Sequence, residues 1–289
     1  MNTVWQDNSL RIEGASFDAR LMLIDSAQCF TWREHQGKFY NVLHGGAISV
    51  EPRPDGLALY PVREEATEAY AHYLDLKRDY GALSSRYAPF PYAVMALERA
   101  PGLRVLNQPP WEALIGFILS ANNNLSRIRR LCALLAEHFG ESRELDDLTL
   151  HALPSPEVLA GVDEQALRAL GFGYRAPFLV NTARMVADGF PLDQLARMPY
   201  DEAHAQLIRL PGVGDKVADC VLLFGCGHSS AFPVDVWVDR LARAWFPELA
   251  DARSRLALQR AARTLFGEDA GLVQQFMFHC ARTGLIPVK

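Results

Sequence analysis

The chain has few lysines, no closely paired cysteines and no long hydrophobic run, and each of these absences excludes a class of protein. Its five cysteines are widely spread and include no C-x-x-C pair, which excludes a disulfide framework and a zinc knuckle. No stretch of about 18 residues is apolar and uncharged throughout, and the N-terminal residues lack the basic and apolar regions of a signal peptide. We therefore expect a cytoplasmic protein without a membrane partner.

The charge balance is acidic, with 29 basic and 34 acidic residues among 289 and a net charge of −5. This balance excludes a protein that coats nucleic acid or anionic membranes non-specifically, although it permits a local basic groove. Only four basic residues are lysines, namely Lys38, Lys77, Lys216 and Lys289. A lysine inside a well-marked motif is therefore unusual in this chain and calls for a functional explanation.

The hydrophobic periodicity divides the chain into a β-rich part and a helical part. Residues from about 17 to 61 alternate between β-branched or aromatic and polar types, and 38–62 predicts three short strands. From about residue 64 the period is helical, as in 111–119 and 128–135. The predicted fold class is α+β, with an N-terminal antiparallel β-rich domain over 1–105 and a mostly helical domain over 106–289. We expect the active site at the seam between these two domains, near residues 99–110, because binding sites favour such places.

Residues 199–247 predict a helix, a glycine hairpin and a second helix. The first helix ends at L-P-G-V-G, residues 210–214, and the second begins directly after it. Gly212 and Gly214 can adopt positive φ and leave backbone N–H groups exposed at the start of the second helix, which suits a DNA phosphate. Because backbone amides supply this site, it needs no net positive charge on the chain.

Two charged residues stand at helix starts in the same segment. Lys216 lies in the first turn of the second helix, where the helix dipole disfavours an ammonium and so favours a nucleophilic amine. Asp235 precedes a helix whose Trp237, Leu241 and Trp245 fall on one face. Simpler interpretations exist: Lys216 as a solvated lysine or phosphate contact, and Asp235 as a helix N-cap. A capping carboxylate can also face a developing positive charge, so the two interpretations of Asp235 are compatible.

The hairpin, Lys216 and the P-V-D triplet nineteen residues after the lysine together form a much more specific pattern than any one of them. Here the sequence resembles the helix-hairpin-helix base-excision glycosylases, and among them the lysine-bearing 8-oxoguanine DNA glycosylase/AP lyase family. Four further segments match in the family's order: A-Q-C-F-T-W at 27–32, S-A-N-N-N at 120–124, L-G-F-G-Y-R-A at 170–176 and G-L-V-Q-Q-F-M-F at 271–278. The resemblance covers nearly the whole chain.

The resemblance implies a bifunctional enzyme that flips an oxidised purine, 8-oxoguanine opposite cytosine, out of double-stranded DNA. Lys216 would attack the sugar C1′ and form a Schiff base, and Asp235 would stabilise the oxocarbenium-like transition state. No metal or redox cofactor is implied. We expect a monomer that associates with the nucleoid when it is bound to DNA.

For the extruded base, the resemblance implies a pocket with four contacts. Phe278 and Cys220 would face the two sides of the base, Gln274 would bind its Watson–Crick edge, and the main-chain carbonyl of Ala27 would accept the N7–H that guanine lacks. Gln274 and Phe278 are four residues apart on a predicted helix and so share a face. Simpler interpretations place Phe278 in the core and make Cys220 a small buried residue.

For the DNA, the resemblance implies four further contacts. Asn122 would fill the space vacated by the base, Tyr174 would wedge beside it, and Arg127 and Arg175 would donate to the orphan cytosine. Without the resemblance, the three asparagines would be interpreted as a helix cap and the arginines as surface residues.

The chain departs from the eukaryotic branch of the family at two positions. Ala27 replaces a glycine, which bears on how tightly guanine is excluded. Trp237 replaces a phosphate-contacting histidine, so that phosphate binding relies more on the hairpin amides and Trp237 is left as a core residue.

Two alternatives follow from the same motifs. A helix-hairpin-helix glycosylase for another oxidised or alkylated base remains open, but the alkylated-base branch lacks the lysine, and Cys280 alone after Cys226 cannot build an iron–sulfur cluster. A non-catalytic DNA-binding module would need the hairpin only, and would leave Lys216 and Asp235 unexplained.

Overall fold

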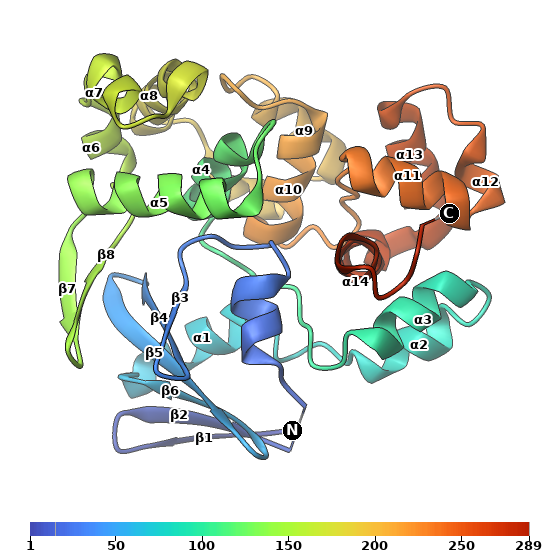
Figure 1. Ribbon diagram of the computed structural model, residues 1–289, viewed down its shortest axis with the longest axis horizontal. Coiled ribbons are helices and arrows are strands. Elements are labelled where there is room, and N and C mark those ends of the chain that lie inside the picture. The colour runs from blue at the N-terminus through green and yellow to red at the C-terminus, as the bar shows by residue number, and fades with distance from the viewer. Residues whose placement is uncertain (15, 289) are drawn as a thin grey trace.

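An antiparallel sheet forms the N-terminal part of the computed structural model, which describes residues 1–14 and 16–288 (Figure 1). Within these residues its six strands are β1 (Asn2–Gln6), β2 (Ser9–Glu13), β3 (Arg33–His35), β4 (Lys38–Leu43), β5 (Gly46–Arg53) and β6 (Gly56–Tyr60). Their spatial order is β1-β2-β6-β5-β4-β3, and all neighbours are antiparallel. The three strands predicted over 38–62 are confirmed as β4, β5 and β6.

The strand prediction is wrong at two places in this part. Strands β1 and β2 precede residue 17, and β2 joins the sheet by pairing with β6, with Leu10 opposite Leu59. The segment Leu21–Asp25 (η1) is a helical turn, because the Asp18 carboxylate accepts a hydrogen bond from the Leu21 N–H at 2.8 Å and begins the turn. A short apolar run cannot be assigned to a strand or a buried turn from periodicity alone.

Helices dominate after the sheet, and 111–119 and 128–135 are helical as predicted. The α-helices in the described part are α1 (Thr67–Tyr73), α2 (Gly81–Arg86), α3 (Pro91–Arg99), α4 (Pro110–Ser120), α5 (Leu125–Phe139), α6 (Pro156–Ala160), α7 (Glu164–Ala169), α8 (Ala176–Ala187), α9 (Tyr200–Leu207), α10 (Asp215–Gly225), α11 (Val236–Trp245), α12 (Pro247–Ala250), α13 (Arg255–Phe266) and α14 (Ala270–Thr283). Short 3₁₀ turns are η2 (Glu64–Ala66), η3 (Gly173–Arg175), η4 (Leu192–Arg197) and η5 (Gly267–Asp269).

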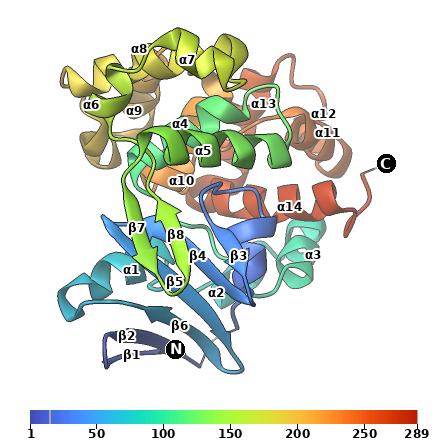
Figure 2. The same ribbon diagram turned by 60° about the vertical axis from the view of Figure 1, so that its left-hand side comes forward.

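An unpredicted hairpin interrupts the helices. Strands β7 (Ser142–Leu145) and β8 (Leu148–His151) extend from the end of α5 down to the sheet (Figure 2). Leu150 packs there in a small cluster with Tyr40 and Val42 of β4. The hairpin therefore joins the helical part to the sheet.

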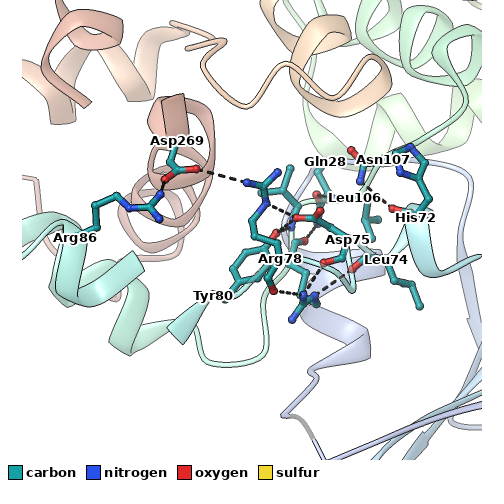
Figure 3. Close-up of polar contacts among 12 residues, drawn as sticks. Gln28, His72, Leu74, Asp75, Arg78, Tyr80, Arg86, Leu106, Asn107 and Asp269 are labelled. Carbon is teal, nitrogen blue, oxygen red and sulfur yellow. Dashed lines mark hydrogen bonds and ion pairs between the residues drawn. The ribbon is translucent and has the colours of Figure 1, made fainter. Parts of the chain in front are cut away.

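The last helix, α14, returns to the first part of the chain and packs on α3, while α10 lies between α4 and α9 near the centre (Figure 1). One large hydrophobic core runs through both parts. Just before α14, the Asp269 carboxylate forms ion pairs with Arg78 and Arg86 of the N-terminal part (Figure 3). In residues 1–14 and 16–288, no helix has the length and apolar character needed to cross a bilayer.

Candidate active site

The predicted helix, glycine hairpin and second helix are confirmed, with the hairpin lying between α9 and α10. Gly212 adopts φ +80°, and a Cβ there would lie 2.9 Å from ring and Cβ atoms of Phe178, so both conformation and space require glycine. The expectation of positive φ is wrong for Gly214, which has φ −105° and ψ −177° because it is the N-cap residue of α10. In the described part of the chain, no atom other than those of its chain neighbours lies within 4 Å of a Cβ built on Gly214, so the N-terminus of α10 is open to a ligand.

Lys216 is held by neutral groups of α4. Its Nζ donates to Ser120 Oγ at 2.9 Å and lies 5.2 Å from the centroid of the Phe117 ring. Ser120 in turn donates to the Phe117 carbonyl at 2.7 Å, so its hydroxyl oxygen is left to accept from the lysine. The lysine is partly buried, and these contacts do not fit the interpretation of a solvated surface lysine.

Asp235 is the N-cap of α11, since its Oδ1 accepts a hydrogen bond from the Val238 N–H at 2.8 Å. The predicted apolar face of this helix is only partly correct. Leu241 and Trp245 are buried, whereas Trp237 is 41% exposed and is not a core residue. Val238 takes the buried position in the first turn, which turns Trp237 outward.

A cavity between α4, α10, α14 and the 26–28 loop brings the predicted catalytic and base-binding residues together. Its volume is about 50 Å³, which is below the usual range for ligand pockets. The residues that line it are Ala27, Phe117, Lys216, Cys220, Phe224, Pro233, Asp235, Gln274, Gln275 and Phe278. Of these, Phe117, Phe224, Pro233 and Gln275 had no role assigned from the sequence, although Pro233 and Gln275 lie within the matched motifs.

Three parts of the cavity wall differ in chemical character: an unpaired amide oxygen, a neutral thiol and an aromatic ring. Gln274 is 4% exposed, and its Oε1 is buried without a hydrogen-bond partner in the described structure. Such an oxygen is costly to leave unpaired, so it suits a ligand that carries an N–H donor. Burial raises the pKa of Cys220 to about 12, with Lys216 acting in the opposite direction, so this thiol is neutral at pH 7. Phe278 is only partly buried and is available as an apolar wall.

The predicted DNA-contacting residues surround one turn. Asn122 is exposed with φ +48°, and the Tyr174 hydroxyl donates to the preceding carbonyl, that of Ala121, at 3.1 Å. Arg175 donates to the carbonyls of Ala121 and Asn122, and it is only 4% exposed, so its interpretation as a surface arginine is wrong. Arg127 spans to the same region, with its Nη2 3.3 Å from the Gly171 carbonyl.

Two grooves extend from this turn. We call the first the hairpin groove; Asn122, Gly212, Gly214, Lys216 and Asp235 line it together with Arg255, Leu256 and Gln259 of α13. The second, the arginine groove, includes Arg127 and Arg130. The contribution of α13 was not predicted, because no motif marks that helix. Among the described residues, no three or more His, Cys, Asp or Glu side chains are grouped so that they could hold a metal ion.

Two family models match adjacent parts of the chain. One, described as 8-oxoguanine DNA glycosylase, N-terminal domain, matches residues 9–114. The other, described as HhH-GPD superfamily base excision DNA repair protein, matches residues 115–265.

Individual relatives give the same result. A Methanothermobacter thermautotrophicus protein named "Probable N-glycosylase/DNA lyase" is 31% identical over 289 residues, covering 88% of this chain and 90% of its own. A Saccharomyces cerevisiae N-glycosylase/DNA lyase is 41% identical over 155 residues, covering 49% of this chain and 41% of its own. The structure of a Clostridium acetobutylicum 8-oxoguanine glycosylase/lyase, in complex with DNA containing cytosine opposite 8-oxoguanine, superposes with a TM-score of 0.91, 28% identity and 99% coverage of both chains.

Proposed function

The chain belongs to the 8-oxoguanine DNA glycosylase family of the HhH-GPD base-excision repair superfamily, and we propose that it excises 8-oxoguanine opposite cytosine through a lysine Schiff base. As a member of this family it is a DNA N-glycosylase with lyase activity. The observation that carries the finer proposal is the single cavity, which Lys216, Asp235 and Gln274 line together. A nucleophile, a carboxylate and a base-binding amide thus face the same cavity.

The proposed reaction begins at the anomeric carbon of the flipped nucleotide. The bond between C1′ and the base nitrogen breaks with its electron pair leaving on the base, and the Lys216 amine forms a new bond to C1′. The Asp235 carboxylate, fixed by its cap to α11, stabilises the positive charge that develops on the sugar. Opening of the sugar ring gives a Schiff base, and loss of a C2′ proton then expels the 3′ phosphate by β-elimination.

The proposed recognition of the base uses the cavity wall. The buried Oε1 of Gln274 accepts an N–H of the Watson–Crick edge and so gains the partner it lacks. The neutral Cys220 thiol and the Phe278 ring contact the two faces of the base. The Ala27 carbonyl accepts the N7–H of 8-oxoguanine, for which guanine has only an acceptor.

The proposed DNA interface centres on the turn at Asn122. This exposed residue enters the stack where the base has left, with Tyr174 beside it, and Arg127 and Arg175 donate to the orphan cytosine. The amides at the open N-terminus of α10, next to Gly214, bind the phosphate backbone.

Borohydride trapping tests the proposal directly. Wild-type protein should form a covalent adduct with a duplex that carries one 8-oxoguanine opposite cytosine, and Lys216→Gln should form none. Lys77→Gln is a matched control, since this exposed lysine pairs only with Glu68 in the described structure, and it should trap as the wild type does. Absence of the wild-type adduct, or its persistence in Lys216→Gln, would exclude the lysine mechanism. Equal excision rates opposite all four bases would exclude the cytosine preference.

A further inference from the structure

Residues 24–28, at the end of η1 and in the loop that follows it, have one carbonyl that accepts no hydrogen bond in the described structure, and it belongs to Ala27. Within the described structure the carbonyls of Ile24, Asp25, Ser26 and Gln28 each accept a hydrogen bond from a side chain elsewhere in the chain. No donor in the described residues reaches the Ala27 carbonyl. Ala27 also lines the cavity that Lys216, Asp235 and Gln274 share, which we call the base cavity. The loop therefore keeps a single acceptor available at the place where a ligand would meet it.

The side chains that hold these carbonyls come from three separate segments. Arg129 of α5 donates to Ile24, Arg282 of α14 donates to Asp25, and Gln108 of the linker before α4 donates to Gln28 at 2.7 Å. The Gln28 side chain itself accepts from the Leu106 N–H at 2.8 Å, as Figure 3 shows. The contact nearest to Ala27 on its N-terminal side comes from Gln275, whose Nε2 donates to the Ser26 carbonyl at 2.8 Å.

The backbone of Ala27 is strained, and the Gln275 contact restrains it. Ala27 has φ +60°, a left-handed conformation that costs a residue with a Cβ about 1–2 kcal/mol. Such a conformation persists only when its surroundings fix it. The Ser26 carbonyl is part of the peptide group that joins Ser26 to Ala27, so rotation of this group changes φ of Ala27 directly. By holding that carbonyl, Gln275 opposes the rotation that would release the strain.

We propose that Gln275 is a specificity-determining positioning residue, which fixes the direction of the Ala27 carbonyl through the Ser26–Ala27 peptide group. This inference rests on the proposed function. Gln275 follows Gln274 on α14, so one rigid helix both carries the base-binding amide and holds the loop that presents the carbonyl. The spacing between the two groups that recognise the base is thereby set by adjacent residues of one helix.

The proposal predicts a loss of discrimination. Without the amide donor of Gln275, the Ser26–Ala27 peptide group can rotate and φ of Ala27 can change. The Ala27 carbonyl then changes direction and no longer meets the N7–H of 8-oxoguanine. Guanine, which has no hydrogen at N7, does not use this carbonyl, so its binding should change little. The preference for the lesion should fall by about tenfold, the value of one hydrogen bond.

The experiment measures DNA affinity in a Lys216→Gln background, so that chemistry does not consume the duplex. The dissociation constants for matched duplexes with 8-oxoguanine or guanine opposite cytosine give a discrimination ratio. Gln275→Met keeps the side-chain length and removes the donor. The matched control is Asn41→Leu, which removes another buried amide donor, 3.0 Å from Thr31 and outside the base cavity.

A ratio that falls about tenfold in Gln275→Met and stays at the background value in Asn41→Leu supports the inference. An unchanged ratio in folded Gln275→Met, or an equal fall in both variants, overturns it. If Gln275→Met does not fold, Gln275→Asn serves instead, because its shorter side chain keeps the amide but cannot reach the Ser26 carbonyl, and the same fall is expected. A background protein with no preference for 8-oxoguanine would instead contradict the proposed function itself.

Discussion

Glu112, in the first turn of α4, has a carboxyl group with an unusual ionisation. Burial raises its pKa from the ordinary value of 4.5 to about 8, so this group is largely protonated at neutral pH. Its charge, when present, acts on the buried Cys29 and Cys132 thiols. Because the folded state binds this proton more tightly than the unfolded state does, protonated Glu112 makes its full contribution to the free energy of unfolding below pH 4.5. This contribution is lost as the pH rises through about 8.

Replacing Glu112 with glutamine should therefore stabilise the protein at alkaline pH. We expect Glu112→Gln to raise the free energy of unfolding by about 2 kcal/mol at pH 9 and by little at pH 5, because the variant has no charge to bury. Urea unfolding across this range measures the difference. Glu137→Gln, at an exposed position of α5, should show no such trend. A difference that is constant with pH would show that burial does not control the ionisation of Glu112.

At the residue scale, the sequence indicated the side chains that line the cavity better than the contacts that hold them in place. The motif around Lys216 marks the lysine itself, but its contact with Ser120 joins residues 96 positions apart. The contact of Gln275 with Ser26 spans 249 positions and ends on a backbone carbonyl, an acceptor that every residue has. Side-chain bonds to a distant main chain follow no sequence spacing, so only the fold reveals them.

At the element scale, α14 is tied to the N-terminal part at its first turn. Asp269, just before the helix, is 5% exposed. Its carboxylate forms ion pairs with Arg86 of α2 and with Arg78, and the distance from Arg78 Nη1 to Asp269 Oδ1 is 3.5 Å (Figure 3). Arg78 also pairs with Asp75 at 2.7 Å, so the aspartates and arginines form one network. Since α14 carries Gln274 and Phe278, this network fixes one end of a wall of the cavity that Lys216 and Asp235 also line.

Removing the carboxylate should weaken this attachment measurably. Asp269→Asn should lower the free energy of unfolding by about 2 kcal/mol, because two arginines lose a buried ionic partner. Glu68→Gln breaks the exposed pair with Lys77 and should cost less than about 0.5 kcal/mol. Chemical unfolding of the two variants side by side gives the comparison. Equal effects would mean that the Asp269 network adds no more than a surface ion pair.

Among the elements that the sequence predicted correctly, α4 and α5 carry the longest periodic patterns, while β4, β5 and β6 were marked by the turn residues between them. Helices α4 and α5 have an apolar stripe over three or more turns, which periodicity detects well. The hairpin of β7 and β8 has strands of four residues, too short for alternation to stand out from the helices around it. It is stabilised by tertiary contact, since Leu150 is buried against β4.

At the scale of the whole molecule, an acidic chain must bind a polyanion, and the two grooves indicate how. The cationic side chains that line the hairpin groove are Lys216 and Arg255, and those of the arginine groove are Arg127 and Arg130. The backbone amides next to Gly214 add hydrogen bonds without adding charge. With a net charge of −5, the molecule has no general attraction for DNA, so binding depends on these few local contacts.

The salt dependence of DNA binding should therefore be shallow. Each phosphate that a cationic side chain neutralises contributes about −0.9 to the slope of log K against log salt, so four or fewer contacts predict a slope of about −2 to −4. Titration of an undamaged duplex from low to physiological salt measures it. Arg255→Gln should reduce the magnitude of the slope by about one, whereas Lys77→Gln, outside both grooves, should leave it unchanged. A slope steeper than about −6 would require an extended basic surface that these grooves do not provide.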